Sequence, residues 1–599
     1  MVLQFVSLIG RVLGDFFYPA DKIFAIVFLV ALAPTLLLWA RWPTVYRGLL
    51  RRVKAFSRLL TRRDAWAFAV VALIPLALRI LTLPVHPIPL PLVHDEFSYL
   101  LSGDTFAHGR VTNPPHPVWQ SFESFHILQQ PTYMSIYPPA PGLSLAVGQV
   151  LFGHPFWGVF FSFGIMCSLT YWACRGWLSR GWALFGAILT GLELGSGYWL
   201  NSYWGGAVAA IGGCLVIGSL GRIWGMRGAH NSGWGQGAWF GLGIAILANS
   251  RPWEGLWLTM GAGLALIYRW ASTRNADERR RIYQAAAPCC VVLILAGSFM
   301  TYYNWRVTGN PFQLPYTLNR ATYAVAPLFV WQSPAPPKEY RYEVMRRFYV
   351  DWEPTGSGAG ASRYSTLRKF VSGTIARAQK METFLFGAGF SVLVLLFAWR
   401  CLSNINFRIL LFCFGIFTIG FALQRYYALP HYLAPLVGLV AVIKLFSLRY
   451  LYCLRWGGRR VGLALAPPFM VAALATGLFG YHLPALLHGR KPPAPDDFRV
   501  MRLEVQHSVL QIPGRHVVLV RYSPTHNFHR EWVYNGAAID SSDIVWARDS
   551  SPEQNRKLME YFSDRNVWLL EPDLDPAAIK VTLLRRGGVA TFVGQRNPG

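Results

Sequence analysis

The sequence has 599 residues, of which 53% are hydrophobic, 15% aromatic and only 14% charged. Apolar runs of roughly 20 residues, enough to cross a bilayer, recur along most of its length and exclude a soluble globular protein. The formal net charge of +27 lies mostly in short loops between these runs. That distribution indicates membrane topology, with some cations near anionic lipid head groups. It excludes nucleic-acid binding, which needs the charge on one polar face.

The N-terminal region, residues 1–63, contains the first predicted span and a strongly basic loop. We expect the opening segment from Met1 to Ala20 to be an interfacial helix or to hide a further crossing. It lacks a basic start with a small-residue cleavage site, so we expect no removable signal peptide. The Arg- and Lys-rich loop 41–63, which follows the first span, is expected on the cytoplasmic side.

The apolar runs predict an α-helical multi-pass membrane protein with about 12 transmembrane helices, roughly 11 to 13. Residues 64–485 hold most of them and form the predicted catalytic module. The stretch from Pro141 to Phe152 is ambiguous between a half-span and an interfacial helix. The predicted spans are 23–40, 65–85, 156–175, 182–198, 204–222, 236–249, 253–268, 285–303, 383–399, 407–424, 431–447 and 462–481.

The first long loop, 86–140, is poor in basic residues and is expected outside. It carries an adjacent acid pair, Asp95 and Glu96, just after a span. Ionised carboxylates beside a membrane span cost free energy unless they remain hydrated, pair with a cation or take part in catalysis. We predict that both are catalytic, as a general base or as ligands of a divalent cation such as Mg²⁺ or Mn²⁺. The alternative is an interfacial acid pair that marks a helix end.

Four other residues of this loop are candidates for substrate binding. Asp104 follows Glu96 by eight residues, so a helix would place it roughly on the same face as Tyr99. The rigid Tyr-Pro-Pro segment that begins at Tyr137 is suited to wall a cavity. His94 is the fourth candidate. The alternatives are a satisfied interface histidine, a solvated amphipathic helix that contains Asp104, and a plain return of the chain into the membrane after Tyr137.

A turn at 249–255 carries Arg251 between two short predicted spans. A guanidinium in that position is suited to meet a phosphate through two hydrogen bonds. Glu254 follows in the same turn, and we predict that both side chains bind substrate. The alternative is an ion pair between Arg251 and Glu254 that only stabilises the turn.

A later turn, 424–432, holds a second cationic and aromatic cluster. Arg425 is a basic residue on the predicted outer face, against the positive-inside rule, so we expect it to bind a phosphate. Tyr426 and His431 are predicted substrate-binding residues beside it.

Starting from the basic loop 41–63, alternation predicts further inside loops that are each basic, so the predicted orientation is self-consistent. Convergence of polar segments on one face is what a membrane enzyme or transporter site needs. Glu193 lies inside an apolar run and is either functional or the partner of a nearby Arg. The segments expected on the outer face are loops 86–140 and 304–382, the latter beginning at Asn304, and turns 201–206, 249–255 and 424–432.

Residues 486–599 are predicted to form a small α/β domain on the periplasmic side. The Pro-rich stretch 488–497 is typical of a linker. Ser551 followed by proline predicts a helix start, and that helix should run to about Arg565. Without a Gly-rich phosphate loop or a triad spacing, the domain is expected to be structural or to dock an acceptor. Its predicted strands lie at 516–522, 543–549 and 566–573.

Taken in order, these motifs resemble the type C (GT-C) glycosyltransferase superfamily. Within it they are most similar to the bacterial branch of protein O-mannosyltransferases and the lipid A aminoarabinose transferase. The resemblance covers most of the chain and rests on the order of the motifs, although the first span and its basic loop depart from the simplest family pattern. The matching motifs are His94-Asp95-Glu96 with Tyr99-Leu100, Tyr137-Pro138-Pro139, Arg251-Pro252, Arg425-Tyr426 with Pro430, and YNWRVTGNPF at 303–312.

The resemblance implies inverting transfer of a sugar from a polyprenyl-phosphate donor to an acceptor outside the membrane. It implies that Asp95 is the general base and that Glu96 orients the site or a cation. It also implies that Arg251 and Arg425 hold the leaving phosphate. The expected location is a bacterial inner membrane, with the active site facing the periplasm. The expected partners are the donor lipid, membrane lipid and a lipid, glycan or protein acceptor.

Two other classes of function stay open at this point. A transporter or flippase of a lipid-linked sugar should show inverted repeats and charges at mid-depth, and the sequence shows no repeat. A glycan polymerase or ligase would place its key cations in a large late loop without needing the early acid pair. All eight cysteines lie in or beside apolar runs, which predicts neither a disulfide framework nor a cysteine metal site.

Overall fold

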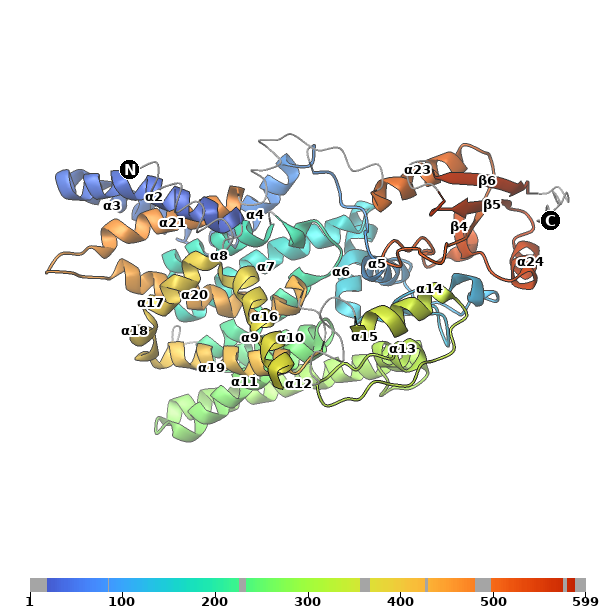
Figure 1. Ribbon diagram of the computed structural model, residues 1–599. Helices are drawn as coiled ribbons and strands as arrows, with labels where there is room; N and C mark the ends of the chain where they lie inside the picture. Colours follow the sequence, from blue (N-terminus) through green and yellow to red (C-terminus); the bar gives the residue numbers. More distant parts are fainter. Residues whose placement is uncertain are drawn as a thin grey trace.

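The computed structural model describes residues 19–84, 86–195, 197–225, 233–355, 367–425, 429–479, 497–574 and 579–587. The chain is mostly helical, and its helices form one elongated bundle with a small sheet at one end (Figure 1). The opening segment from Met1 to Ala20 lies outside the described residues, apart from its last two.

Eight helices of the described chain are long and apolar enough to cross a membrane, as expected for a multi-pass membrane protein. Each coincides with a predicted span, because a long apolar run is a strong signal of a membrane helix. These helices are α2 (Pro19–Arg41), α4 (Asp64–Leu81), α7 (Phe156–Trp177), α9 (Gly206–Ile223), α12 (Ala276–Thr308), α19 (Ile405–Ala422), η6 with α20 (Pro430–Leu436 and Val437–Tyr452) and α21 (Gly462–Phe479).

Helices also form at three other predicted spans, at α8 (Arg180–Gly195), α10 (Gly233–Ala248) and α11 (Pro252–Ser272). α8 and α10 have only 16 residues each, fewer than the roughly 20 that a straight crossing needs. The number of spans, about 12, therefore stays a prediction.

The predicted span at 383–399 is strongly bent in the structure. The chain there forms α16 (Leu367–Met381), the π-helix η5 (Glu382–Phe386) and α17 (Ala388–Leu396), and the two halves meet at 98°. The bend lies at Gly387, whose φ of +71° suits a residue without a Cβ.

The predicted loops contain short elements as well. The basic loop 41–63 is largely helical, and the ambiguous stretch 141–152 lies in a 14-residue helix, α6. The elements between the spans are α3 (Pro43–Leu60), α5 (His94–Ala107), η1 (Trp119–Phe122), β1 (Ile127–Leu128), β2 (Met134–Ser135), α6 (Pro139–Phe152), η2 (Tyr198–Leu200), α13 (Pro315–Tyr323), α14 (Glu343–Arg346), η3 (Arg347–Trp352), α15 (Glu353–Thr355) and α18 (Ala398–Leu402).

The long outer loop does not begin at Asn304, as the sequence predicted, because α12 continues to Thr308. The helix ends where Gly309 takes a left-handed conformation, with φ +78°, and donates its backbone N–H to the carbonyl of Trp305 (2.9 Å). The predicted end of this helix lies several residues too early, because the polar residues that follow Tyr303 still belong to α12.

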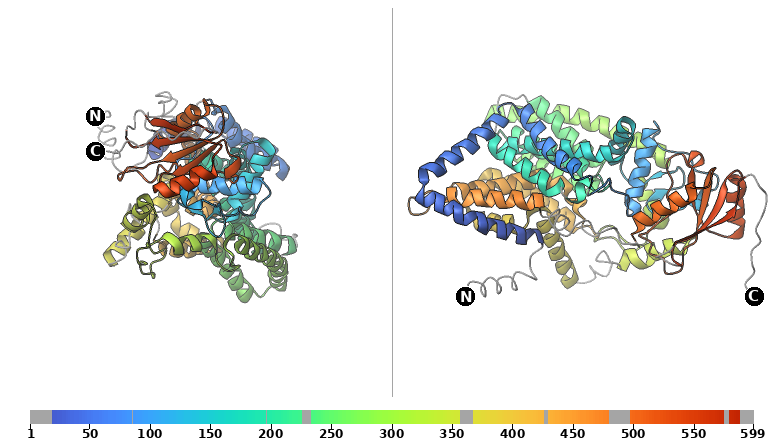
Figure 2. Two further views of the ribbon diagram at one scale, coloured as in Figure 1. Left: turned by 90° about the vertical axis from the view of Figure 1, so that its right-hand side faces the viewer. Right: turned by 90° about the horizontal axis from the view of Figure 1, so that it is seen from above.

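The bundle has two distinct ends. α3 and α18, which hold parts of two basic loops, lie at one end (Figure 1). α5, α13, α14 and the C-terminal sheet lie at the other, and a perpendicular view shows the same separation (Figure 2). The segments that loop charge assigned to opposite sides of a membrane are thus separated along the bundle.

Glu193 of α8 has a cationic partner inside the bundle. The Lys444 Nζ of α20 lies 2.9 Å from one Glu193 carboxylate oxygen and 3.1 Å from the other. The partner is a lysine rather than the expected arginine. Because the pair neutralises an acid among apolar helices, Glu193 joins α8 to α20 rather than standing alone as a charge.

The C-terminal residues form a compact α/β unit around a four-stranded sheet of order β4-β3-β5-β6. The first three strands are parallel and β6 is antiparallel to β5. All three predicted strands are present, whereas α23 and the edge strand β6 were not predicted, and α24 ends earlier than expected. The elements are α23 (Phe498–Leu510), β3 (His516–Val520), η7 (Ile539–Ser541), β4 (Ile544–Arg548), α24 (Pro552–Tyr561), β5 (Asn566–Glu571) and β6 (Lys580–Arg585).

The predicted start of α24 is confirmed by its cap. The Ser551 hydroxyl accepts the backbone N–H of Gln554 (3.3 Å), and Pro552 occupies the first helical turn. Most of the predicted linker, 488–497, lies outside the described residues.

Candidate active site

The two acids of the pair lie in the first turn of α5 but have different surroundings. Glu96 is buried, and its carboxylate oxygens accept the backbone N–H groups of Leu92 (2.9 Å) and Tyr203 (3.0 Å). Burial raises the pKa of Glu96, and these N–H groups oppose that rise. Glu96 thus ties α5 to the turn 201–206, and Asp95 is the acid that meets the other polar side chains.

A short hairpin brings two polar side chains to Asp95. β1 and β2 pair antiparallel, and Ser98 of α5 holds them by donating its hydroxyl to the carbonyl of His126 (2.6 Å). The same hydroxyl lies 2.7 Å from that of Ser135. Because His126 directly precedes β1 and Tyr137 closely follows β2, the hairpin delivers both side chains to the start of α5.

Three side chains surround the Asp95 carboxylate. The Tyr137 hydroxyl donates to Oδ1, and the His126 Nδ1 lies 3.2 Å from the same oxygen. The His94 Nδ1 lies 3.1 Å from Oδ2 and 3.1 Å from the His126 Nδ1. The Asp95 side chain remains 16% exposed. It is therefore held in place and still open to a small reactant.

The electrostatics favour an ionised Asp95. Burial by itself raises the pKa of this carboxyl, but the neighbouring His126 and His94 outweigh it and hold the pKa well below its usual range. Burial, reinforced by His126, lowers the pKa of His94. Burial also raises the pKa of Tyr137 well above 10. At neutral pH the cluster therefore contains one carboxylate, a neutral imidazole at His94 and a neutral phenol, an arrangement that can accept a proton.

His126 is the one described non-glycine residue with a left-handed backbone, at φ +59°. Its carbonyl accepts both the Ser98 hydroxyl and the backbone N–H of Ile136 (3.3 Å). Such a conformation costs about 1–3 kcal/mol and persists where surrounding contacts determine it. Here those contacts aim the imidazole at Asp95.

The Tyr-Pro-Pro segment forms a wall of the site. The Tyr137 ring stacks on that of Tyr99, with centroids 4.3 Å apart and planes at 14°. Pro139 begins α6, and the next residue, Ala140, donates its N–H to the carbonyl of Asn249 (2.9 Å). The segment thus joins the Asp95 cluster to the turn that holds Arg251.

Arg251 presents a positive charge to this wall. It precedes α11 and lies over the ring of Tyr432, 4.8 Å from the centroid. Burial raises the pKa of Tyr99 to about 12, and the positive charge of Arg251 opposes that rise. No ion pair joins Arg251 to Glu254 in the described chain, since Glu254 accepts the side-chain amide of Gln424 (3.0 Å). The two side chains thus form no salt bridge in the described chain, although the Glu254 charge still acts on Arg251.

His431 lies on the same side of the site as Arg251. It is buried, bonds to the hydroxyl of Tyr198 and stacks on the ring of Trp204, with centroids 4.4 Å apart. The tilted ring of Tyr432 lies 4.6 Å away. The turns 201–206 and 424–432, distant in sequence, meet at these contacts.

Arg425 has structural contacts at the edge of this region. Its Nη2 donates to the carbonyl of Val330 (2.9 Å), and its backbone N–H donates to that of Leu328 (2.8 Å). The residue holds turn 424–432 against loop 304–382. Tyr426 lies outside the described residues.

Asp104 is placed away from Asp95, near the C-terminal end of α5. Its carboxylate accepts the backbone N–H of Ala537 (2.7 Å) and the side-chain amide of Gln149 (2.8 Å). α5 is helical as expected, but the structure places Asp104 at the junction of α5, α6 and the C-terminal unit, not with the Asp95 cluster.

The C-terminal unit also reaches the candidate site. The ring of His529 lies 5.6 Å from that of His94, with planes at 25°, and Trp352 packs against its edge at 4.7 Å. Burial lowers the pKa of His529 to about 4. The Phe348 ring lies 5.2 Å from the His94 ring. Loop 304–382 and the C-terminal unit together cover one side of the cluster.

The donors around Asp95 also fit a metal ion. Ligand atoms of His94, Asp95 and His126 all lie within 4.8 Å of one another. Two imidazoles and one carboxylate suit a borderline cation such as Zn²⁺ or Mn²⁺ better than Mg²⁺, which prefers oxygen ligands. Glu96, expected as a second ligand, has both oxygens on backbone N–H groups instead.

Sequence reasoning missed His126, Trp352 and His529. His126 and His529 stand outside helices and strands, and Trp352 ends the helix η3, so no spacing relates any of them to Asp95. His126 stands close before the predicted Tyr-Pro-Pro wall, and that proximity to a named motif was the one available signal.

The sequence matches no protein-family model and no curated protein. Several solved structures are similar to this chain at low sequence identity. One is the Archaeoglobus fulgidus oligosaccharyltransferase in the apo form (TM-score 0.42, 14% identity, covering 76% of this chain and 62% of that one). This chain therefore spans less than two thirds of the length of that structure.

Two other structures are similar as well. ArnT from Cupriavidus metallidurans, bound to undecaprenyl phosphate, gives a TM-score of 0.46 and 14% identity over 88% of this chain and 98% of that one. The mycobacterial arabinofuranosyltransferase AftD gives 0.38 and 13% over 87% and 37%.

Proposed function

We propose that this protein transfers a sugar from a polyprenyl-phosphate donor to a hydroxyl or amine acceptor, with inversion at the anomeric carbon. The observation that carries the proposal is the Asp95 carboxylate, which is partly exposed and oriented by three side chains. The ordered sequence motifs that contain it support the same reaction class. We further propose that the site faces the periplasm of a bacterial inner membrane.

In the proposed reaction, Asp95 accepts the proton of the acceptor as the acceptor oxygen or nitrogen attacks the anomeric carbon. The bond from that carbon to the phosphate oxygen breaks with both electrons going to the phosphate. The products are the glycosylated acceptor and the polyprenyl phosphate. Because Tyr137 and His126 fix the carboxylate, little ordering is needed when the acceptor arrives.

The leaving phosphate needs a cation, and Arg251 is the residue best placed to supply one. No carboxylate lies within ion-pair distance of it among the described residues, and its charge already reaches Tyr99 in the wall of the site. A guanidinium offers paired donors to phosphate oxygens. Arg425 is the second proposed phosphate ligand, at the far edge of the same region.

The other polar residues take supporting roles. Glu96 fixes the start of α5, while Tyr99 and Tyr137 form the wall against which the sugar would rest. A divalent cation held by His94, Asp95 and His126 would supply positive charge next to the reacting groups.

Comparison of matched strains tests the proposal. Lipids and glycans from a deletion strain carrying an empty plasmid, the wild-type gene or the Asp95→Asn variant would be compared by mass spectrometry. We expect one sugar to be missing from one acceptor in the deletion, restored by wild type and still missing with the variant at equal membrane abundance. Identical glycans in all strains, or full restoration by the variant, would overturn the proposed reaction.

A further inference from the structure

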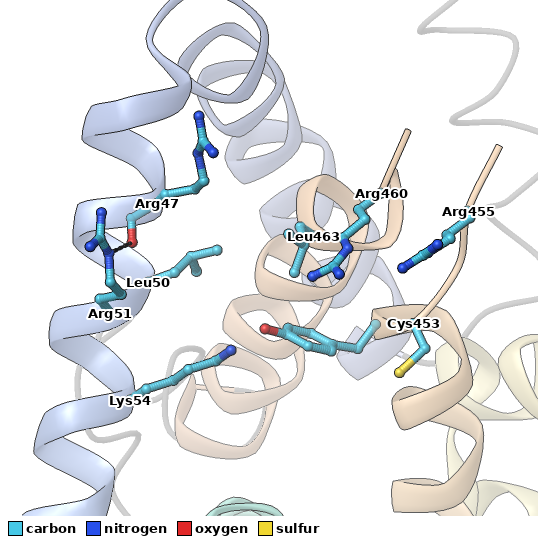
Figure 3. A pocket seen from close by; sticks show the side chains of 9 residues that line it. Arg47, Leu50, Arg51, Lys54, Cys453, Arg455, Arg460 and Leu463 are labelled. Carbon is cyan, nitrogen blue, oxygen red and sulfur yellow. Dashed lines mark hydrogen bonds between the residues drawn. The ribbon is translucent and has the colours of Figure 1, made fainter. Parts of the chain in front are cut away.

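A second polar cavity lies at the other end of the bundle from Asp95. Its volume is about 700 Å³, and it forms where α3 faces the turn between α20 and α21 (Figure 3). Arg47, Arg51 and Lys54 line it from α3, and Arg455 and Arg460 line it from the turn. No acid is among its lining residues.

These cations have no counter-ion among the described residues. Arg47 and Arg51 each donate from Nε to a backbone carbonyl four residues earlier, at 3.0 and 3.4 Å. These bonds hold the two guanidinium groups on the helix and leave their terminal nitrogens available. Like charges gathered in one hollow repel one another, so the arrangement favours a bound anion that brings them together.

The cavity walls are held in register. The Tyr46 hydroxyl of α3 donates to the carbonyl of Leu463 in α21 (2.6 Å). Lys54 lies over the ring of Tyr452, 5.3 Å from the centroid. The Tyr452 hydroxyl is buried without a hydrogen-bond partner in the described chain. An oxyanion in the cavity would supply an acceptor for such a donor.

The surroundings indicate a lipid rather than a soluble ligand. α3 crosses the end of the bundle (Figure 2). Val45, Leu49, Val53 and Phe56 are 51–62% exposed and recur at helical spacing. A helix with a basic face and an exposed apolar face lies at a membrane interface, where phosphate head groups are concentrated.

We propose that this cavity binds the phosphate group of an anionic membrane lipid. Both walls belong to loops that charge patterning assigns to the cytoplasmic side, so the lipid would come from that leaflet. The site goes beyond the proposed transfer reaction, because it lies at the opposite end of the bundle and shares no residue with the Asp95 cluster.

The test titrates the purified full-length protein with phosphatidylglycerol and follows bound lipid by native mass spectrometry. Arg51→Gln with Lys54→Gln removes two cations from one wall, and Arg455→Gln with Arg460→Gln removes two from the other. The matched control, Arg52→Gln with Arg58→Gln, removes two cations of α3 that do not line the cavity. Each lining cation should contribute about fivefold to affinity, so each cavity variant should bind about 25-fold more weakly.

The control should bind the lipid with an affinity close to that of wild type, because its two cations do not line the cavity. Equal weakening in all three variants would overturn the site, because it would indicate diffuse attraction to basic loops. A second arm adds inorganic phosphate at constant ionic strength. The lipid should stay bound at millimolar phosphate, whereas displacement at equimolar phosphate would identify a soluble phosphate compound as the ligand and overturn the lipid assignment. Melting temperatures of the variants confirm that they remain folded.

Discussion

His126 lies with its Nδ1 3.2 Å from the Asp95 carboxylate, although the two residues belong to different elements. Asp95 stands in the first turn of α5, and His126 stands at the start of a hairpin held to that helix by Ser98. The imidazole offsets the effect of burial on the carboxyl pKa. The relationship makes Asp95 an ionised, fixed acceptor, and the pH behaviour of the protein should report it.

Replacing Asp95 by Asn keeps the shape of the side chain and removes the proton acceptor. We expect the turnover of sugar transfer to fall by about 10²–10⁴-fold, the contribution typical of a general base. Purified protein in lipid nanodiscs with a labelled polyprenyl-phosphate sugar provides the measurement.

The same substitution at Asp104 is the control for the Asp95 variant. The side-chain amide introduced by Asp104→Asn would keep an oxygen for the Ala537 N–H, so stability should change more than turnover. Equal losses of turnover in both variants would contradict the separate roles given to the two acids.

Replacing His126 by Asn should move the acid limit of activity to higher pH. The pKa of Asp95 is held below its usual range, so the carboxylate form persists as pH falls. Removal of His126 takes away the larger of the two neighbouring influences that lower this pKa, and protonation then begins at higher pH. A pH profile of kcat/KM for the variant and wild type measures the shift.

The exposed His108, replaced by Gln, serves as the control for that profile, since it contacts Asp104 rather than Asp95. If the two variants give the same profile as wild type, His126 does not set the ionisation of the base.

Arg251→Ala should weaken use of the donor lipid. A charge-assisted hydrogen bond contributes about 1.5–3 kcal/mol, so kcat/KM for the donor should fall roughly 10- to 100-fold. Arg251→Lys should recover part of it, because lysine keeps the charge and loses the paired donors. Arg425→Ala should raise the KM for the donor by less, because that guanidinium also holds the carbonyl of Val330. Unchanged donor dependence in both alanine variants would remove these arginines from the phosphate site.

Metal binding can be measured independently of activity. Wild-type protein dialysed against Zn²⁺ or Mn²⁺ should retain about one ion per chain by elemental analysis if His94, Asp95 and His126 form a site. His126→Ala should lose that ion. His529→Gln removes a neighbouring imidazole outside the ligand set and should retain it. Equal metal content in the two variants would show that the ion is held elsewhere.

Much of the bundle was predictable because apolar runs and basic loops reflect the physics of the bilayer directly. The acid pair, the Tyr-Pro-Pro wall and Arg251 were predictable because charges and rigid aromatic segments are rare beside spans. The bend at Gly387 was not, since glycine within an apolar run is also common inside a continuous membrane helix. His126 and His529 were not either, because tertiary packing alone brings isolated histidines from a hairpin and the C-terminal unit to Asp95.

The C-terminal unit should depend on one buried ion pair. The Arg548 Nη2 lies 2.8 Å from a Glu531 carboxylate oxygen, and the two side chains are 1% and 0% exposed. The Nε of Arg548 also donates to the carbonyl of Glu123 in the outer loop (2.5 Å). Glu531→Gln would leave an unbalanced buried guanidinium, which typically costs about 3–5 kcal/mol. Hydrogen exchange at the amides of β3 and β4 in the full-length protein should therefore accelerate strongly.

A partly exposed ion pair, Arg521 with Asp549, provides the comparison for the buried pair of Glu531. Arg521, whose side chain is 53% exposed, lies 2.5 Å from Asp549 in the same unit. Arg521→Gln should cost only about 0–1 kcal/mol, because solvent screens an exposed charge. A similar acceleration of exchange in both variants would mean that burial of the Arg548–Glu531 pair has no special weight. Suppose instead that only Glu531→Gln accelerates exchange and that it also reduces sugar transfer. The fold of this unit would then be connected to the cover that His529 provides over His94.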